Sequence, residues 1–427
     1  MIAQVSGVPG KKHTKTGNPP CHFVRRWLNT PVFSHVPVYF MSLSNYRLLR
    51  LVSKLISSGK STPLILPEPS DPASIKALMM RAQVQLDAGT LRSFYAGKRI
   101  LVTGAGGSIG SEICKQVLSL GAAHVTLVDH SELALYEIDR AIREQFPNRC
   151  AQPVLCSIRR KERLAAVVME HKPDVIFHAA ALKHVPMVEL NPCEAVLTNV
   201  LGTQYVIEAA KAAGVKQLVL ISSDKAVAPS SLMGATKRLA EHLVRTQITE
   251  NHQACVVRFG NVLGSTGSVV PLFRSQIERG GPITLTDKSA ERYFMTIFEA
   301  VQLVLTAAMN NANTPQHHSG LYILEMGEPI KIYDLATRMI RLYGFRPDKD
   351  IKITFTGLRE GEKITEALVD DNEVRKPVLP GIFEVGNQAH VPPIAHEVME
   401  TLYNLAQEGH DDNAKAMVFN LVNSLRE

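Results

Sequence analysis

The sequence RILVTGAGGSIG, residues 99–110, decides the fold of this chain. An apolar run rich in β-branched residues ends at Gly104, and helical periodicity begins at Ser108. The glycines let the backbone turn tightly, approach a pyrophosphate closely and pack a helix against the preceding strand. The N-terminus of that helix adds N–H groups and the positive end of a dipole. The stretch therefore predicts a strand, a phosphate-cradling loop and a helix in direct succession.

Regular alternation of helices and strands follows. After Gly110 we expect a helix to Leu120, a strand ending near Asp129, a helix from Ser131 to about Phe146, a strand around Val154, a helix from about Arg160 to His171, and strands at 174–178 and 216–221. Strands that alternate with long helices form a parallel sheet that is buried on both faces. The sequence predicts a Rossmann-like, doubly wound α/β fold with a smaller C-terminal α/β region that binds substrate.

Charge is unevenly distributed along the chain. Residues 1–60 hold nine of the 47 basic residues and none of the 40 acidic ones, which leaves 38 basic residues for the remainder. A basic stretch rich in Pro, Ser and Thr is typical of a flexible tail. We predict a basic, partly disordered N-terminal segment and linker at 1–83, a cofactor-binding domain with the catalytic residues at 84–265, and a substrate-binding region with C-terminal helices at 266–427.

Composition also bears on partners and location. Outside residues 1–60 the chain is slightly acidic, so we expect no nucleic-acid partner. No run approaches the roughly 18 to 20 apolar residues of a membrane-spanning helix, so we expect no integral membrane segment. The basic N-terminus leaves peripheral contact with anionic lipid open. The six cysteines lack metal-ligand spacing, so we predict free thiols, a cytoplasmic location and no metal site.

An acidic residue supports binding of a dinucleotide. Asp129 ends the second predicted strand 19 residues after Gly110, close to where a carboxylate accepts hydrogen bonds from the adenosine ribose. Its charge would repel a 2′-phosphate, so NAD is favoured over NADP. The residues predicted from this pattern to bind the cofactor are Gly104, Gly107, Ser108, Ile109, Gly110 and Asp129.

Six motifs in order carry a family resemblance. They are the glycine loop and the segments Ala179–Pro186, Asn199–Thr203, Ser223–Ala226, Met233–Arg238 and Arg258–Ser265. Together they resemble the extended short-chain dehydrogenase/reductases and, more narrowly, the bacterial polysaccharide-biosynthesis proteins of the CapD type, the long-form UDP-N-acetylglucosamine 4,6-dehydratases. The resemblance runs from about Val84 to about Gly386. Long-form members begin with membrane helices, which this sequence lacks, so its first 80 or so residues depart from the family.

The resemblance implies a lyase that uses NAD and acts on a UDP-sugar. A 4,6-dehydratase takes hydride from sugar C4, a base removes the C5 proton while the C6 hydroxyl leaves, and the hydride returns to C6. The product from UDP-N-acetylglucosamine is a UDP-4-keto-6-deoxy sugar for surface polysaccharide, in a capsule or lipopolysaccharide. The family also implies a homo-oligomer in the cytoplasm, and a place at the inner face of the bacterial cytoplasmic membrane stays open.

The catalytic residues depart from the short-chain dehydrogenase pattern. Met233 stands four residues before Lys237, where such enzymes carry a tyrosine, and a thioether has no acidic proton. The acid and base must lie elsewhere, and Asp224 and Lys225 supply both types on adjacent residues at a strand end. We predict Asp224 as acid toward the C6 oxygen, Lys225 as base at C5 and Ser223 as hydrogen-bond partner of the C4 hydroxyl. The group that takes the C4 proton stays open.

Further roles follow from the resemblance. Lys237, Ala179, Ala180 and Asn199 are implied to contact the cofactor, and Met233 to pack against the sugar or nicotinamide. Lys183 and His184 follow the fourth strand at its carboxyl end, where ligands bind in open α/β sheets. The substrate-binding residues predicted are Lys183, His184, Arg258, Asn261, Arg292, Arg359 and Glu362.

Two alternatives remain open. A nucleotide-sugar epimerase or reductase would use the same cofactor cradle, although a 4-epimerase normally relies on the tyrosine that Met233 replaces. A non-catalytic NAD-binding protein would keep the glycines but lose the polar site, whereas Asp224, Lys225 and Lys237 are all present.

Overall fold

The structure is a computed structural model of the chain. It describes residues 78–79, 87–247, 252–314, 319–386 and 392–425. The chain divides into two compact units, residues 1–62 and 63–427, and all the described residues belong to the second. The predicted basic segment at 1–83 lies outside the described residues except for Leu78 and Met79.

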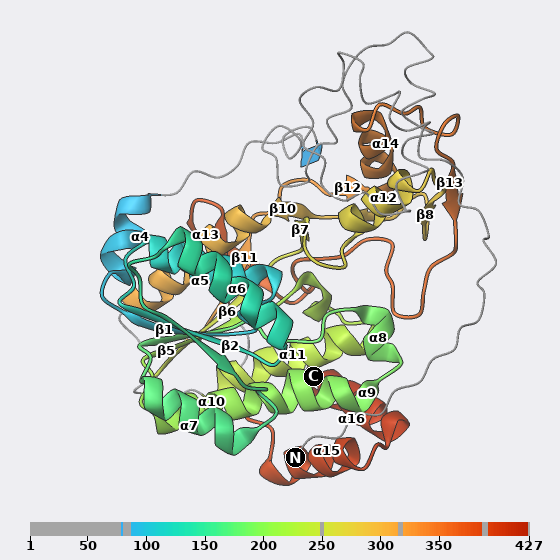
Figure 1. Ribbon diagram of the computed structural model, residues 1–427. Coiled ribbons are helices and arrows are strands. Elements are labelled where there is room, and N and C mark those ends of the chain that lie inside the picture. Colours follow the sequence, from blue (N-terminus) through green and yellow to red (C-terminus); the bar gives the residue numbers. More distant parts are fainter. Residues whose placement is uncertain (1–77, 80–86, 248–251, 315–318, 387–391, 426–427) are drawn as a thin grey trace, which may run out of the picture. The chain divides into compact units, whose positions relative to one another are not determined.

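A nine-stranded sheet forms the centre of the described chain (Figure 1). In spatial order its strands are β14 (Val374–Leu379), β15 (Ile382–Gly386), β11 (Ser319–Leu324), β6 (Gln253–Arg258), β5 (Gln217–Ile221), β4 (Val175–His178), β1 (Arg99–Thr103), β2 (His124–Asp129) and β3 (Ala151–Leu155). The strands from β11 to β3 pair in parallel, and the β14–β15 hairpin adds an antiparallel edge. The carboxyl ends of the parallel strands therefore meet at one edge of the sheet.

Helices cover both faces of this sheet (Figure 1). One face carries α4 (Ala88–Tyr95), α5 (Ser108–Ser119), α6 (Glu132–Gln145) and α13 (Ile297–Asn313). The other carries α7 (Lys161–His171), the π-helical turn η2 (Val196–Leu201), α10 (Gly202–Ala212) and α11 (Leu232–Thr246). Each face has its own apolar core, and β1 gives Ile100 and Val102 to one and Leu101 to the other. The predicted doubly wound fold is confirmed.

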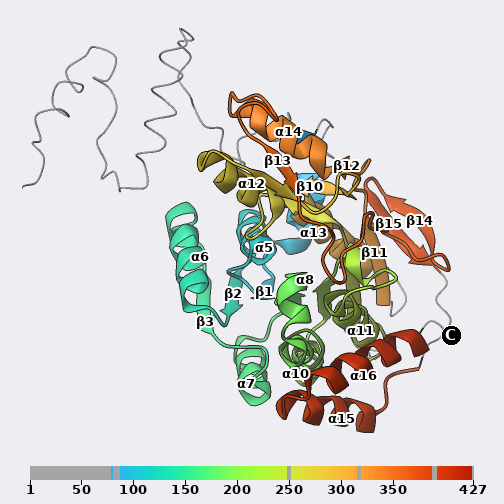
Figure 2. The same ribbon diagram turned by 90° about the vertical axis from the view of Figure 1, so that its right-hand side faces the viewer.

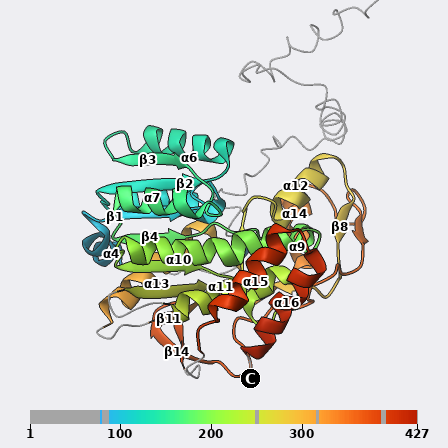
Figure 3. The same ribbon diagram turned by 90° about the horizontal axis from the view of Figure 1, so that it is seen from below.

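The C-terminal segment does not form a body separate from this sheet. β11, β14 and β15 extend the sheet, and α13 packs beside α5. At the end of the chain, α15 (His396–Gln407) and α16 (Asp411–Ser424) pack on α11, η2 and the short helix α9 (Pro192–Ala195), as Figure 3 shows. The predicted boundary at residue 265 therefore falls within one compact unit.

A smaller lobe holds most of the remaining elements. These are β7 (Asn261–Leu263), α12 (Val269–Glu278), β8 (Ile283–Leu285), β9 (Glu291–Arg292), β10 (Phe294–Thr296), β12 (Ile330–Lys331), α14 (Ile332–Leu342) and β13 (Ile353–Phe355). Figure 2 shows α12, α14 and β13 grouped together, and three two-stranded pairings link β7 with β10, β9 with β12, and β8 with β13. No helix in the described ranges combines the length and apolar character of a membrane span.

The backbones of β1, α5 and the chain after β4 approach each other closely at the glycine loop. Gly104 has φ +68°, and a Cβ there would stand 2.7 Å from the Cα of Ala180. A Cβ at Gly110 would overlap the carbonyl oxygen of Gly104. Only glycine lets the first turn of α5 pack this closely on the loop before it.

Replacing Gly110 with Ala is expected to lower the free energy of unfolding by about 1–3 kcal/mol, because the loop must move to admit the methyl group. Chemical denaturation measures the change. Gly386→Ala is the matched control, since an added Cβ there meets no atom closer than 3.8 Å. Equal stability of the two variants would contradict the tight packing of the loop.

Candidate active site

The carboxyl ends of the parallel strands open into a cavity of about 1330 Å³. Its wall includes the predicted residues Gly104, Gly107, Ser108, Ile109, Gly110, Asp129, Ala179, Ala180, Lys183, His184, Ser223, Lys225, Met233, Lys237, Asn261, Arg292, Arg359 and Glu362. Three predicted site residues, Asp224, Asn199 and Arg258, do not line it. The fold thus brings most of the predicted site together around one space.

One end of the cavity has the features of a dinucleotide cradle. The glycine loop and the start of α5 line it, and Gly107 at the helix N-cap has no side chain to occupy the first N–H groups. The carboxylate of Asp129 accepts hydrogen bonds from the Gly106 and Ser131 N–H groups, both at 2.9 Å. Asp129 therefore fixes the glycine loop, and its oxygens keep lone pairs that face the cavity wall.

Asn199 requires a correction. The sequence predicts it as a cofactor contact, but its side chain is buried. Its Oδ1 accepts from the Leu182 N–H at 2.8 Å, and its Nδ2 donates to the Leu182 carbonyl and the Thr236 hydroxyl, both at 3.0 Å. Asn199 therefore joins the loop after β4 to α11 and does not line the cavity.

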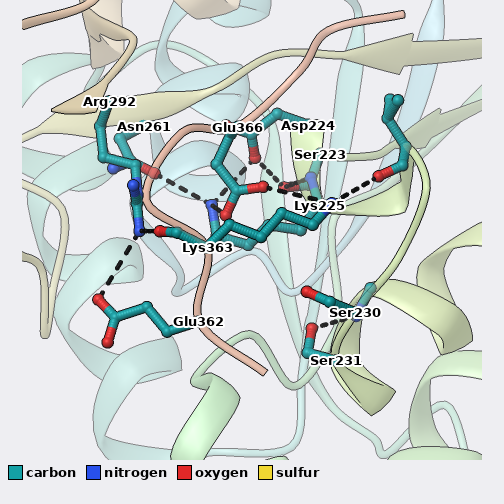
Figure 4. A network of polar contacts seen from close by, with 12 residues as sticks. Ser223, Asp224, Lys225, Ser230, Ser231, Asn261, Arg292, Glu362, Lys363 and Glu366 are labelled. Atoms are coloured by element: carbon teal, nitrogen blue, oxygen red, sulfur yellow. Dashed lines mark hydrogen bonds and ion pairs between the residues drawn. The ribbon is translucent and has the colours of Figure 1, made fainter. Parts of the chain in front are cut away.

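The turn after β5 carries the predicted acid and base. Asp224–Ala226 form the 3-10 turn η3, which Ser223 caps by accepting from the Lys225 N–H. The Ser223 hydroxyl donates to Asp224 Oδ1 at 2.8 Å, and Lys225 Nζ donates to the same oxygen at 3.0 Å, as Figure 4 shows. Lys225 is 21% exposed and lines the cavity, whereas Asp224 is wholly buried behind it. Ser223 and Lys225 are therefore the residues of this segment that line the cavity.

Helix α11 packs directly against that turn. A Cβ at Gly234 would overlap the Lys225 carbonyl oxygen, so only glycine allows this contact. Met233 and Lys237 lie one turn apart on α11 and line the cavity. Lys237 Nζ donates to the Ile221 carbonyl at 2.6 Å. Burial lowers the pKa of Lys237 to about 8, although the negative charge of Glu241 raises it.

Arg258 also requires a correction, because it belongs to a buried ion-pair network. Its guanidinium is wholly buried and pairs with Glu241 at 2.7 Å and with Glu373 at 2.6 Å. Burial would raise the pKa of Glu373, but the charge and hydrogen bonds of Arg258 lower it to about 2. Arg258 does not line the cavity, and its donors join β6, α11 and the segment before β14.

Two basic residues of the loop after β4, Lys183 and His184, also line the cavity. Lys183 Nζ donates to the Thr266 carbonyl at 2.9 Å, and the Thr266 N–H donates to the Ser108 hydroxyl at 3.1 Å. Burial lowers the pKa of Lys183, and burial followed by the charge of Lys183 lowers the pKa of His184. The segment around Thr266 therefore joins the cofactor end of the cavity to the residues after β4.

Arg292 and its neighbours close the far end of the cavity. The guanidinium of Arg292 donates to the carbonyls of Glu291, Ile364 and Lys363 at 2.6–2.7 Å, and lies 3.7 Å from Glu362. Two of these three hydrogen bonds hold the loop at 357–366, and the third goes to the residue before Arg292. The Arg359 N–H donates to Glu362 Oε2 at 3.3 Å, so the same loop presents Arg359 and Glu362 to the cavity.

Sequence reasoning missed Glu366. Its carboxylate is 5% exposed and lies 4.0 Å from Lys225 Nζ, although 141 residues separate the two along the chain. No motif or periodicity singled it out, and the only available signal was its place three residues after Lys363, in the loop that carries Arg359 and Glu362.

Comparison with known proteins gives a family match. The model of the family described as "Polysaccharide biosynthesis protein" matches residues 100–386. Capsular polysaccharide biosynthesis protein CapD of Staphylococcus aureus is 46% identical over 303 residues, which cover 70% of this chain and 50% of CapD. The chain thus spans about half the length of CapD.

Two relatives carry different enzyme names. UDP-N-acetylglucosamine 4,6-dehydratase (inverting) of Campylobacter jejuni is 33% identical over 285 residues, covering 65% of this chain and 79% of that protein. UDP-glucose 4-epimerase of Rickettsia conorii is also 33% identical, over 290 residues that cover 66% of this chain and 80% of the epimerase.

Solved structures share the fold. Pen from Bacillus thuringiensis is 33% identical, with a TM-score of 0.62 over 74% of this chain and 98% of its own. The dTDP-glucose 4,6-dehydratase DesIV of Streptomyces venezuelae, solved with NAD bound, is 22% identical, with a TM-score of 0.54 over 63% of this chain and 88% of its own. The resemblance inferred from the motifs is confirmed.

Replacing Arg258 with Met is expected to lower the free energy of unfolding at pH 7 by about 3–5 kcal/mol, because Glu241 and Glu373 would lose their wholly buried cationic partner and keep the more exposed Arg238. Wild-type stability should fall as pH drops from about 4.3 toward 2, since the lowered pKa of Glu373 stabilises the fold only while this carboxylate is charged. In the variant this loss should be smaller, because without Arg258 the pKa of Glu373 in the folded state is lowered less.

Chemical denaturation across this pH range tests the Arg258 network. Arg140→Met is the control, since Arg140 lies at the surface 3.7 Å from Glu144 and its loss should change stability by no more than about 0.5 kcal/mol. Similar effects of the two substitutions would contradict the structural role of Arg258.

Replacing Lys237 with Met is expected to raise the free energy of unfolding at pH 7 by up to about 3 kcal/mol, because a lowered pKa means that the folded state penalises the charged amine. The unfolded chain binds more protons between pH 8 and about 10.4, so wild-type stability should rise with pH there. Denaturation should therefore show a difference between the two proteins that shrinks from pH 8 to 10. A constant difference would contradict burial as its cause.

Proposed function

Because this chain belongs to the polysaccharide biosynthesis protein family, we propose that it is an NAD-dependent nucleotide-sugar 4,6-dehydratase, a lyase that converts UDP-N-acetylglucosamine to a UDP-4-keto-6-deoxy sugar. The observation that carries this proposal is the contact between Lys225 and Asp224 at the cavity, combined with a methionine at position 233. The site thus offers an acid–base pair but no titratable group where simple hydride-transfer enzymes of this fold carry tyrosine.

The cofactor end of the cavity fits a dinucleotide. The backbone at Gly104 and Gly110 leaves no room for a Cβ, and the first N–H groups of α5 face the cavity wall. We propose that these groups bind the pyrophosphate, that Asp129 accepts from the adenosine ribose, and that Lys237 binds the nicotinamide ribose. Bound NAD would accept the C4 hydride and return it to C6. A carboxylate at position 129 favours NAD over NADP.

The contact between Asp224 and Lys225 can supply both proton-transfer groups without a change in net charge. Transfer of one proton over the 3.0 Å from Lys225 Nζ to Asp224 Oδ1 converts an ion pair into a neutral acid and a neutral amine. In water an ordinary carboxyl and ammonium differ by about 6.5 pKa units, so the neutral pair lies about 9 kcal/mol higher. Asp224 is wholly buried, where an ion pair loses the solvation that favours it in water.

The geometry suggests how each group reaches the sugar. Lys225 lines the cavity, so its amine can remove the C5 proton directly. Asp224 does not line the cavity, but Ser223, Lys225 and Gly260 beside it do. A Cβ at Gly260 would stand 3.1 Å from Asp224 Oδ2, so the missing side chain keeps the path to this oxygen short. We propose that Asp224 protonates the leaving C6 oxygen along this side, while Ser223 binds the C4 hydroxyl.

We assign the UDP group to the opposite wall. Lys183, His184 and Asn261 surround the approach to the catalytic turn, and Arg292, Arg359 and Glu362 lie beyond it. Arg292 makes three hydrogen bonds to backbone carbonyls and has five N–H groups, so two are left for a diphosphate oxygen pair. The printed names of the relatives include both a dehydratase and an epimerase that act on UDP-sugars, which supports this substrate class for both candidate activities.

Replacing Asp224 with Asn or Lys225 with Ala is expected to abolish loss of water, lowering kcat at least about 10²-fold, because each change removes one half of the acid–base pair. Mass spectrometry after incubation with UDP-N-acetylglucosamine and NAD measures the product. NAD binding should persist in both variants. The control Lys216→Ala breaks the exposed contact between Lys216 and Asp174, at 3.4 Å, and should keep full activity.

The same assay separates the alternative activities. Loss of one water without consumption of NAD supports the dehydratase. A product of unchanged mass would instead identify an epimerase, and turnover of no UDP-hexose would identify a non-catalytic binding protein. Full activity of either variant would overturn the assignment of Asp224 and Lys225.

A further inference from the structure

Four charged side chains from two distant segments meet beside the cavity (Figure 4). Asp224 and Lys225 come from η3, and Lys363 and Glu366 come from the loop at 357–366. Lys225 Nζ lies 3.0 Å from Asp224 and 4.0 Å from Glu366 Oε1, and Lys363 Nζ lies 3.9 Å from Glu366 Oε2. Two carboxylates and two ammonium groups thus alternate, and their formal charges cancel.

The two carboxylates are poorly satisfied by hydrogen bonds. Asp224 is 0% and Glu366 5% exposed, and among the described residues neither Asp224 Oδ2 nor Glu366 Oε2 has a hydrogen-bond partner. A buried carboxylate without hydrogen bonds is costly unless a cation lies near it. Lys225 is the group that both carboxylates share, so its position and charge are tied to Glu366 as well as to Asp224.

The loop that carries Glu366 is fixed at two further points. Lys363 Nζ donates to the carbonyls of Val227 and Ala228, at 3.1 and 2.7 Å, immediately after η3. Arg292 on the cavity wall donates to the carbonyls of Lys363 and Ile364. Glu366 is therefore held against the catalytic turn by a segment whose other end presents Arg359 and Glu362 to the cavity.

We propose that Glu366 is a positioning residue that holds the Lys225 ammonium on the side opposite Asp224 and favours its charged form between catalytic events. Its role rests on the proposed function, in which Lys225 is the C5 base. Glu366 does not line the cavity, so it acts on the sugar only through Lys225. The charged groups around Lys225 in this arrangement are Asp224 on its own turn and Glu366 and Lys363 on the loop; Asn261, at 3.4 Å, is neutral.

Kinetics of Glu366→Gln test the effect on the reaction. The amide keeps the shape of the side chain but no longer attracts the Lys225 ammonium, so Lys225 loses one of the two groups that position it. We therefore expect kcat to fall at least about tenfold while KM for UDP-N-acetylglucosamine stays within about twofold. The matched control is Glu360→Gln in the same loop, because Glu360 is 77% exposed and pairs with Lys415 outside the cavity. Unchanged kcat in Glu366→Gln, or an equal loss in the control, overturns the proposal.

A second readout does not depend on turnover. Lysines are labelled by reductive methylation with ¹³C-formaldehyde, and the Lys225 signal is identified by its loss in Lys225→Ala. Removal of a nearby anion disfavours the ammonium, so in Glu366→Gln the NMR titration midpoint of Lys225 should move to lower pH by about one unit. Glu366→Asp keeps the charge and should keep the midpoint near that of the wild type, which also provides a variant should the amide fail to fold.

The two experiments separate failure of this inference from failure of the proposed function. If the wild-type protein dehydrates no UDP-hexose, the proposed activity is wrong, and the titration alone decides whether Glu366 controls Lys225. If the wild-type protein is active but the Lys225 midpoint is the same in Glu366→Gln and the wild type, the role of Glu366 is overturned.

Discussion

The close approach of three backbone segments at the glycine loop is the constraint on which the site depends. Gly104 packs against the chain after β4, and Gly110 packs against Gly104, with no room for a Cβ at either position. The relative positions of β1, α5 and β4 are therefore fixed. Parallel pairing then carries this alignment across the sheet, because each strand end is set by its neighbour's register. The turn after β5 therefore reaches the same edge as the cofactor cradle, although more than 100 residues separate them.

Burial of charge is the second organising feature, and the structure handles it in two ways. Arg258 satisfies two carboxylates with four short contacts, which lowers the pKa values of Glu241 and Glu373 and produces a fixed structural joint. Around Lys225 the contacts are fewer and longer, and within the described part of the chain Asp224 Oδ2 and Glu366 Oε2 have no hydrogen-bond partner. The first arrangement is a fully paired joint, whereas the second leaves two buried carboxylates dependent on Lys225.

The sequence was sufficient where local pattern sets the structure. The glycine loop, the strand–helix alternation and most cavity residues follow from periodicity and motif order, because parallel strands bring their carboxyl ends together. It failed where a distant partner decides the role of a side chain. Arg258 lies within a motif, yet Glu241 and Glu373, which occupy it, stand 17 and 115 residues away. Glu366 was missed for the same reason, since only tertiary structure brings its loop to Lys225.

The charged groups around the cavity explain why a methionine is suited to position 233. A tyrosine at that position would add a third proton donor one helical turn from Lys237, in a site where burial already lowers the pKa of that lysine to about 8. A thioether adds none, so the proposed acid and base are the adjacent Asp224 and Lys225. In the proposed reaction a proton moves between these two groups without changing the net charge, and Lys225 lies within reach of two carboxylates. The proposed elimination ends with its cofactor unchanged, and it requires a proton system that also returns to its starting state.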